Sequence, residues 1–157
     1  MRGRQVATSA ATPHRSAAVG RRGVLELHVP ARTESVAAAR HAVAQHLARA
    51  GVPSIVIDDL ELVTSELVTN AIVHPRPPVA TVQVRVVVAD DIEMQVAHRG
   101  AAAALPPIDA WQPVPATALR GRGLGIVRRL CDDVHVAQDG ERVVITCRRS
   151  VPDRGAK

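Results

Sequence analysis

Two polar side chains lie one helical turn apart in an otherwise apolar stretch of this sequence. Glu66 and Asn70 are four residues apart in ELVTSELVTNAIVH (residues 61–74). Residues at this spacing share one face of a helix, so the pattern predicts a carboxylate beside an amide. The amide oxygen of Asn70 could bind Mg²⁺, which prefers oxygen ligands, and Glu66 could act as a general base. The alternative is a polar pair that neighbouring groups satisfy and that does no chemistry.

A second feature is the glycine-rich run RGRGLGIVRRL (residues 120–130). Glycines let backbone amides approach an anion closely, and the start of a helix adds further donors and positive potential. No strand precedes the run within a βαβ unit, so the dinucleotide-binding fingerprint does not fit. A glycine turn before a helix is common, and the run alone therefore does not establish an anion site.

Together and in this order, the two features resemble a known superfamily. Residues 66–71 followed by His74 resemble the N box of the GHKL (histidine kinase-like) ATPases, and residues 121–125 resemble their G2 box. The short chain and the sequence ELVTSELVTNA resemble one branch, the anti-sigma factor serine kinases of actinobacteria. The resemblance covers about residues 24–148 and implies the Bergerat fold, with ATP held between the helical layer and a mobile lid.

The resemblance also implies residue roles and the cofactors ATP and Mg²⁺. Asn70 would hold Mg²⁺, and Glu66 would take the proton from a substrate serine or position a water. The remaining nucleotide-binding residues would be His74, His98, Gly100, Gly121, Arg122, Gly123, Leu124 and Gly125. Among them, the stretch from Gly121 to Gly125 would cradle the phosphates.

One position departs from the family pattern. The family has an aspartate after the strand that reads MQVAH here, and its carboxylate accepts a hydrogen bond from the adenine amino group. This sequence has His98 there, followed by Arg99 and Gly100. A neutral imidazole accepts one hydrogen bond without charge, and losing a charge-assisted bond costs about 1.5–3 kcal/mol.

Three functions remain open on this basis. The first is an ATP-binding regulator of the anti-sigma factor serine kinase type, which controls transcription by partner switching and is a candidate protein serine/threonine kinase. The second is a degenerate, non-enzymatic anti-sigma or partner-switching module that has lost ATP. The third is a histidine-kinase catalytic fragment. The expected partners are a sigma factor, an anti-anti-sigma protein and a second copy of the chain.

The elements that would position these residues follow from periodicity. Apolar stripes predict helices over residues 33–50 and 55–74, and a third helix within residues 121–133. Alternation predicts strands over residues 23–29, 79–90, 92–98, 134–138 and 142–148. We expect an α/β two-layer sandwich, with helices on one face of a mostly antiparallel mixed sheet. The expected core contains Leu60, Val63, Leu67, Val84, Val86, Val96, Ile126, Leu130 and Val144.

The stretch from Arg99 to Arg120 is too long for a plain connection in so compact a domain. It lacks periodicity, and we expect it to form the lid. The single aromatic residue of the chain, Trp111, falls inside it. This placement would make Trp111 a reporter of lid closure.

Charge and composition limit the domain organisation, the partners and the location that the sequence allows. Residues 1–22 contain five arginines and no acidic residue, and so account for the whole net charge of +5. We expect a basic disordered tail over residues 1–22, one ATP-binding domain over 23–149 and a C-terminal tail over 150–157. A nearly neutral domain with one aromatic ring is not expected to bind nucleic acid directly. Two cysteines without disulfide or metal spacing, and no apolar run long enough for a membrane span, favour a cytoplasmic location without membrane contact.

Overall fold

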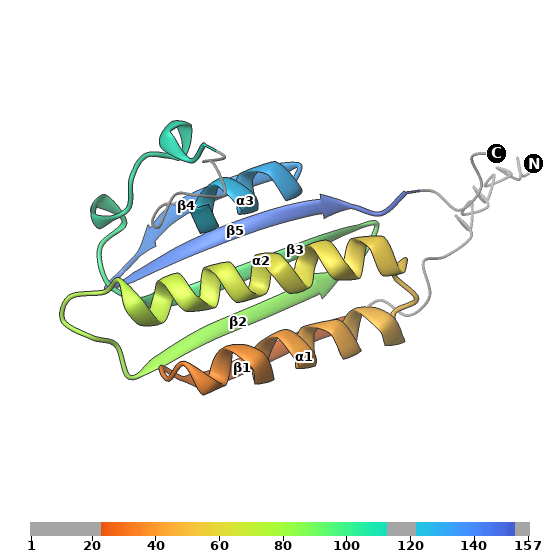
Figure 1. Ribbon diagram of the computed structural model, residues 1–157, viewed down its shortest axis with the longest axis horizontal. Helices are drawn as coiled ribbons and strands as arrows, with labels where there is room; N and C mark the ends of the chain where they lie inside the picture. The colour runs from red at the N-terminus through yellow and green to blue at the C-terminus, as the bar shows by residue number, and fades with distance from the viewer. Residues whose placement is uncertain (1–22, 113–121, 153–157) are drawn as a thin grey trace, which may run out of the picture.

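The computed structural model describes residues 23–112 and 122–152. Their helices and strands follow one another as β1 (Gly23–Pro30), α1 (Glu34–Arg49), α2 (Ser54–Val73), β2 (Thr81–Val88), β3 (Asp91–Arg99), the 3₁₀ turns η1 (Ala102–Ala104) and η2 (Ile108–Ala110), α3 (Arg122–Leu130), β4 (Asp133–Asp139) and β5 (Arg142–Ser150). The ribbon forms two layers, with the helices packed over one side of the sheet (Figure 1). The expected α/β sandwich is confirmed.

The five strands are ordered β1-β2-β3-β5-β4, and each neighbouring pair among them is antiparallel. Met94 at the centre of β3 lies opposite Val86 of β2 and Cys147 of β5. The described sheet thus contains no parallel pair, although a mixed sheet was expected. β4 returns to the sheet edge beside β5, which brings the end of α3 next to β5.

Alternation along the strands separates a buried face from an open one. In β2, Val82, Val84, Val86 and Val88 are buried, whereas Gln83 and Arg85 are partly exposed. Side chains alternate between the two faces of a strand, so the valines lie under the helices and the polar residues lie on the opposite face. The open face carries ion pairs between neighbouring strands, such as Arg85 with Glu26 at 3.3 Å.

The two long helices each bury one stripe. Ala39, Val43 and Leu47 are the buried residues of α1, four apart, as an amphipathic helix requires. α1 ends at Arg49, and Gly51 follows two residues later with a φ of 76°, a conformation that favours glycine. Pro53 then precedes the first turn of α2, where its missing N–H costs nothing. The short connection makes α1 and α2 antiparallel neighbours (Figure 1).

Most of the predicted core residues are buried, but three are not. Leu60, Val63, Leu67, Val84, Val86 and Val96 are at most 1% exposed, as predicted. Ile126 and Leu130 are only partly buried, because α3 turns Val127 into the core instead. Val144 was also predicted wrongly, since Val143 occupies the helix side of β5 and Val144 therefore faces the open side. Among the described residues, no helix has the length and apolar character needed to cross a membrane.

Candidate functional site

The candidate site lies where α2 meets the beginning of α3. Glu66 is on the side of α2 that faces Gly123, in the first turn of α3. A Cβ atom added to Gly123 would overlap Oε2 of Glu66 and lie 3.2 Å from its Cδ. The two sequence features that suggested chemistry, 57 positions apart, are therefore brought into direct contact. Only a residue without a side chain fits beside the carboxylate in this arrangement.

Asn70 lies one turn further along α2 and carries an unsatisfied polar atom. Its Nδ2 is buried and has no hydrogen-bond partner among the described residues. Buried amides are almost always hydrogen-bonded, and an unsatisfied one costs about 1–3 kcal/mol. Nδ2 is a hydrogen-bond donor, so a ligand that satisfied it would be an acceptor such as a phosphate oxygen. No three described His, Cys, Asp or Glu side chains cluster as a metal site, so Mg²⁺ at Asn70 would take most ligands from phosphate and water.

The first turn of α3 presents backbone N–H groups that could bind an anion. The first four N–H groups of a helix have no partner within the helix, and in α3 these belong to residues 122–125. Gly125 is buried, and Leu124 packs against the core, so both help to fix the turn in place. Gly121 and the side chain of Arg122 lie outside the described part of the chain. The phosphate cradle over Gly121–Gly125 remains a prediction.

His98 occupies the end of β3, where its register is fixed. It lies opposite Val143, which is buried on the helix side of β5. Its Nδ1 is 2.9 Å from the carbonyl oxygen of Arg99. A carbonyl can only accept, so Nδ1 carries a proton, and in the neutral imidazole Nε2 is then the acceptor. His98 therefore presents one neutral acceptor, without the charge of a carboxylate.

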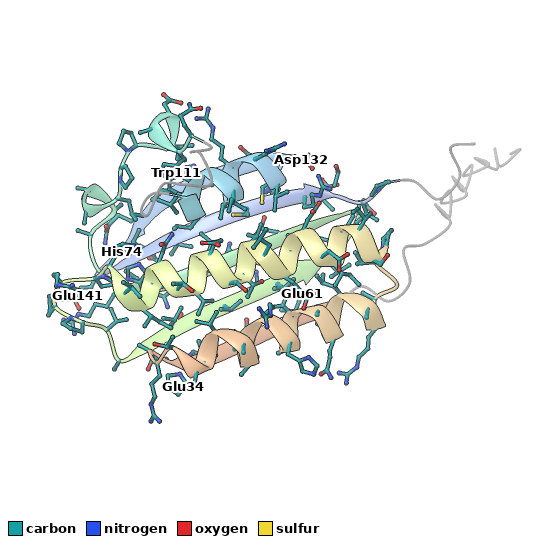
Figure 2. The ribbon with its side chains drawn as sticks, in the orientation of Figure 1. Glu34, Glu61, His74, Trp111, Asp132 and Glu141 are labelled. Carbon is teal, nitrogen blue, oxygen red and sulfur yellow. The ribbon has the colours of Figure 1, made fainter. Side chains whose placement is uncertain are left out.

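Two other predicted residues lie at the same end of the molecule. His74 caps the C-terminus of α2, where its N–H bonds to the carbonyl oxygen of Asn70 at 3.1 Å, and its side chain is exposed. Gly100 follows β3 and donates its N–H to Glu141 at 2.9 Å. Figure 2 shows His74 and Glu141 together at the end of the sandwich where α2 stops. No hydrogen bond or ion pair joins His74 or Gly100 to Glu66.

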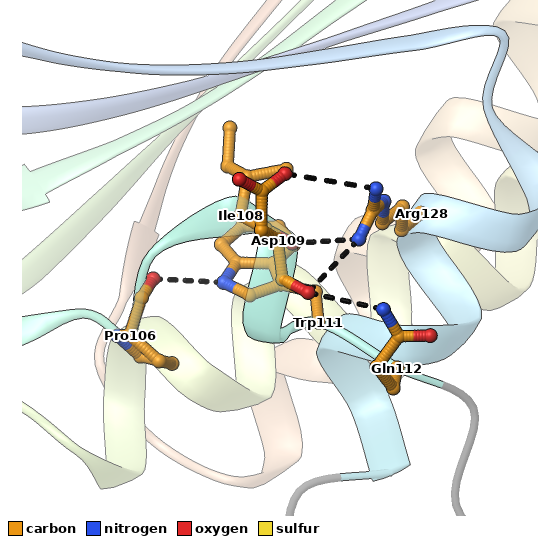
Figure 3. Close-up of polar contacts among 6 residues, drawn as sticks. All are labelled: Pro106, Ile108, Asp109, Trp111, Gln112 and Arg128. Atoms are coloured by element: carbon orange, nitrogen blue, oxygen red, sulfur yellow. Dashed lines mark hydrogen bonds and ion pairs between the residues drawn. The ribbon is translucent and has the colours of Figure 1, made fainter.

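The segment after β3 is held in place by side chains that the sequence did not reveal. Gln138 of β4 accepts from the N–H of Ala102 at 2.7 Å and donates to the carbonyl of Gly100 at 3.0 Å. Arg128 of α3 donates to the carbonyl oxygens of Ile108 at 3.1 Å and Asp109 at 3.2 Å (Figure 3). No periodicity or motif marks these two residues, because their partners are distant in sequence.

Trp111 is part of the core rather than of an open lid. It is 2% exposed, and its Nε1 donates to the carbonyl of Pro106 at 2.9 Å (Figure 3). Trp111 was expected to lie in a lid over residues 99–120. For the described part of that stretch, residues 99–112, the expectation is wrong. The remainder of the proposed lid, residues 113–121, lies outside the described residues.

Comparison with known proteins identifies the family of the chain. The family model of the histidine kinase-like ATPase domain matches residues 29–148, which include both Glu66 and Gly123. This chain belongs to that family. The family is defined by an ATPase domain, so the site described above lies in the part of the chain that carries the ATP-binding fold. The assignment to the finer branch rests on individual relatives.

Among curated relatives, a serine-protein kinase RsbW from Oceanobacillus iheyensis is 30% identical over 122 residues, covering 71% of this chain and 77% of the relative. A serine-protein kinase RsbW from Listeria monocytogenes is 28% identical over 133 residues, covering 78% of this chain and 85% of the relative. The chain is thus similar to RsbW kinases over most of their length.

Two solved structures share the fold. The RsbU and RsbW domains of Rv1364c from Mycobacterium tuberculosis superpose with a TM-score of 0.59 at 19% identity, covering 81% of this chain and 32% of that one. The SiaB–SiaC complex from Pseudomonas aeruginosa superposes with a TM-score of 0.60 at 13% identity, covering 80% of this chain and 88% of that one. At these identities the likeness concerns the fold alone.

Proposed function

We propose that this chain is an ATP-dependent protein serine kinase that regulates transcription by partner switching. The observation that carries the proposal is the contact between Glu66 and Gly123, one turn from the unsatisfied amide of Asn70. A carboxylate, an amide and the start of a helix are the groups that phosphoryl transfer needs for proton removal, metal binding and phosphate binding. Similarity to RsbW serine kinases supports serine as the acceptor.

Each residue then has a distinct task. When bound, Mg·ATP would supply the phosphoryl group, and its Mg²⁺ would neutralise part of the phosphate charge. Asn70 would hold the metal through its amide oxygen, and the first-turn amides of α3, including those of Gly123 and Gly125, would hold phosphate oxygens. Glu66 accepts the proton of the substrate serine hydroxyl as that oxygen attacks. Proton removal by a positioned side chain contributes about 10²–10⁴-fold to a rate.

The partners follow from the same proposal. A serine kinase of this type binds a sigma factor and releases it when an unphosphorylated anti-anti-sigma protein competes. Phosphorylation of the competitor by the kinase restores sigma factor binding. We propose that the chain acts as a homodimer in this cycle.

A second candidate function is favoured by His98. Its single neutral acceptor replaces a charge-assisted contact, and a weaker nucleotide site would suit a module that binds partners without turnover. Such a module would keep the helical layer and the partner surface. A measurement of nucleotide binding distinguishes the two functions, because the kinase requires ATP and the partner-switching module does not.

The decisive experiment combines calorimetry with a phosphoryl-transfer assay. Wild-type protein is expected to bind Mg·ATP and to phosphorylate a serine on an anti-anti-sigma protein. Glu66→Ala should bind Mg·ATP within a few-fold of wild type but lose transfer by about 10²–10⁴-fold. Absence of Mg·ATP binding in the wild type would exclude the kinase and leave the binding module. Binding with equal transfer by both proteins would show that Glu66 is not the base.

A further inference from the structure

One side of α2 is apolar although it faces away from the core. Four large hydrophobic side chains of the described residues are exposed, and three of them belong to α2: Ile55 at 62%, Leu62 at 42% and Val73 at 50%. α2 lies between α1 and α3 and covers the sheet (Figure 1). Its outward side therefore stays open in the described part of the chain.

The three side chains form one line along the helix. Leu62 follows Ile55 by seven residues and Val73 follows Leu62 by eleven, which are close to two and three helical turns. At the rise of an α-helix this line is about 27 Å long. Single exposed hydrophobic residues are ordinary, whereas an aligned set on one helix is typical of an interaction surface. We call Ile55, Leu62 and Val73 the outer stripe of α2.

The proposed base lies within the outer stripe. Glu66 is four residues after Leu62 and seven before Val73, so it shares their side of the helix, and it is partly exposed. Measured along the helix axis, Ile55 lies about 16 Å before Glu66 and Val73 about 11 Å after it. A protein segment whose serine hydroxyl reached the Glu66 carboxylate would therefore lie over apolar side chains on both sides of that serine.

The charges of α2 add a second requirement. All four of its charged residues are acidic, namely Asp58, Asp59, Glu61 and Glu66. Arg149 neutralises Asp59 at 2.8 Å, whereas neither Asp58 nor Glu61 forms an ion pair with a described residue. Asp58 is exposed and borders the outer stripe, three residues after its first member. Basic side chains in a bound segment would complement these carboxylates.

We propose that the outer stripe of α2 is the docking surface for the protein substrate, and that the segment around the accepting serine carries apolar side chains on both sides and basic side chains beside them. The inference rests on the proposed function, because that function places the serine at Glu66. Apolar contacts at Ile55 and Val73 are distant from the reacting atoms, so they stabilise the bound substrate and the transition state equally. Their loss is expected to raise KM without lowering kcat.

The test uses the full-length chain with the protein substrate of the phosphoryl-transfer assay. Ile55→Lys and Val73→Lys replace the two ends of the stripe, and calorimetry without nucleotide gives the substrate Kd. Each change should raise both Kd and KM by about 5- to 20-fold, the worth of burying the exposed part of such a side chain. The kcat of both variants and the Mg·ATP affinity of Ile55→Lys should stay at the wild-type values. Circular dichroism confirms that the variants are folded.

Val24→Lys is the matched control. Val24 is the fourth exposed hydrophobic residue, at 54%, but it lies opposite Val87 on the open face of the sheet. The same substitution there should change neither Kd nor KM. Unchanged Kd and KM in Ile55→Lys and Val73→Lys, or an equal rise in Val24→Lys, would overturn the docking surface while leaving the kinase intact.

Asp58→Asn tests the charge of the partner. It should weaken substrate binding by up to about 5-fold in low salt, the range of an exposed ion pair, and the difference should vanish near 1 M salt. Tighter substrate binding in Asp58→Asn would contradict a basic segment.

The remaining outcomes separate this inference from the proposed function. Substrate binding that depends on Ile55 and Val73 without phosphoryl transfer would refute the kinase and keep the docking surface. No substrate binding by the wild type would refute both. Loss of a dimer in Ile55→Lys, measured by light scattering, with an unchanged substrate Kd would assign the stripe to a second copy of the chain. A lysine effect that disappears when residues 1–22 are removed would assign it to that arginine-rich segment. Either assignment would overturn the proposal.

Discussion

Glu66 and Gly123 are in contact although 57 positions separate them in the chain. The carboxylate fills the space where any other residue at 123 would place its Cβ. The positive end of the α3 dipole is therefore directed at an acidic side chain, an arrangement that stabilises negative charge near the helix start. The same helix end would also attract phosphate. The proposed base, Glu66, and the bound phosphate would therefore both lie at the start of α3.

Gly123→Ala is expected to displace the Glu66 carboxylate. The new Cβ would overlap Oε2, so either the side chain or the first turn of α3 must move. Phosphoryl transfer should fall by about 10²–10⁴-fold, the usual worth of a positioned base, while the fold is retained. Steady-state transfer assays and circular dichroism measure the two effects.

A double-mutant cycle provides the control for this contact. Glu66→Ala removes the carboxylate, so adding Gly123→Ala in that background should cost little or slightly stabilise, since alanine favours helix by up to about 1 kcal/mol over glycine. The two changes should therefore be non-additive in unfolding free energy, as expected for residues in contact. Additive effects would mean that Gly123 acts on something other than Glu66.

Asn70→Ala is expected to leave the stability of the free protein unchanged or slightly higher. The variant removes a buried Nδ2 that has no partner in the described part of the chain, and such a group costs about 1–3 kcal/mol rather than stabilising the fold. Binding of Mg·ATP should nevertheless weaken more than binding of ATP without metal. Urea unfolding and calorimetry with and without Mg²⁺ measure the two quantities.

Thr64→Ala is the matched control on the same helix. Its hydroxyl is buried and donates to the carbonyl of Leu60 at 2.7 Å, so its loss should destabilise by about 1 kcal/mol without selective loss of Mg·ATP binding. If Asn70→Ala instead loses stability as Thr64→Ala does and binds Mg·ATP normally, Asn70 is structural.

The sequence predicted those parts of the fold that depend on local periodicity. The four-residue spacing of Ala39, Val43 and Leu47 and the alternation of β2 each repeat over several turns or residue pairs, so their burial could be assigned in advance. The spacing of Glu66 and Asn70 likewise needed only the helix period. Their shared face is a local property.

The errors occurred where local pattern is ambiguous. Val143 and Val144 are equally apolar neighbours in β5, and only pairing with β3 decides which one faces the helices. Ile126 and Val127 are likewise adjacent apolar residues in α3, and only the packing of the helix decides which one is buried. Contacts such as Arg128 with Ile108, or Gly123 with Glu66, require the tertiary fold and have no signature in the chain.

Arg128→Ala is expected to loosen the segment that carries Trp111. The guanidinium donates to two backbone carbonyls, and its side chain is 39% exposed, so its loss should cost about 1–2 kcal/mol. Trp111 emission should shift to the red and become accessible to iodide, because the ring leaves its buried site. Arg129→Ala, at an exposed position that follows Arg128 in α3, should alter neither the stability nor the emission of Trp111. Unchanged emission in Arg128→Ala would show that core packing alone fixes Trp111.

Asp132 is expected to contribute stability that is lost in acid. The backbone N–H of Ser150 at 2.5 Å, and then its hydroxyl at 2.7 Å, hold the pKa of Asp132 below its usual value. A carboxylate with a lowered folded pKa stabilises above its unfolded pKa of about 3.9 and loses that contribution as pH falls through the folded value. Asp132→Asn should therefore melt below wild type at pH 7, and the gap should close below about pH 4. A gap that is constant with pH would contradict this role.

His98→Asp is expected to strengthen nucleotide binding if the chain binds ATP at all. The family pattern has a carboxylate at this position for the adenine amino group, whereas His98 offers only the neutral Nε2 acceptor, since Nδ1 donates to Arg99. Replacing a neutral by a charge-assisted hydrogen bond should tighten Mg·ATP binding by about 10-fold or more. His98→Asn, which also offers an uncharged acceptor, is the matched control and should stay near wild type. Calorimetry that detects binding only in His98→Asp would identify a partner-switching module that has given up ATP. Equal affinities in all three proteins would show that residue 98 does not contact the base.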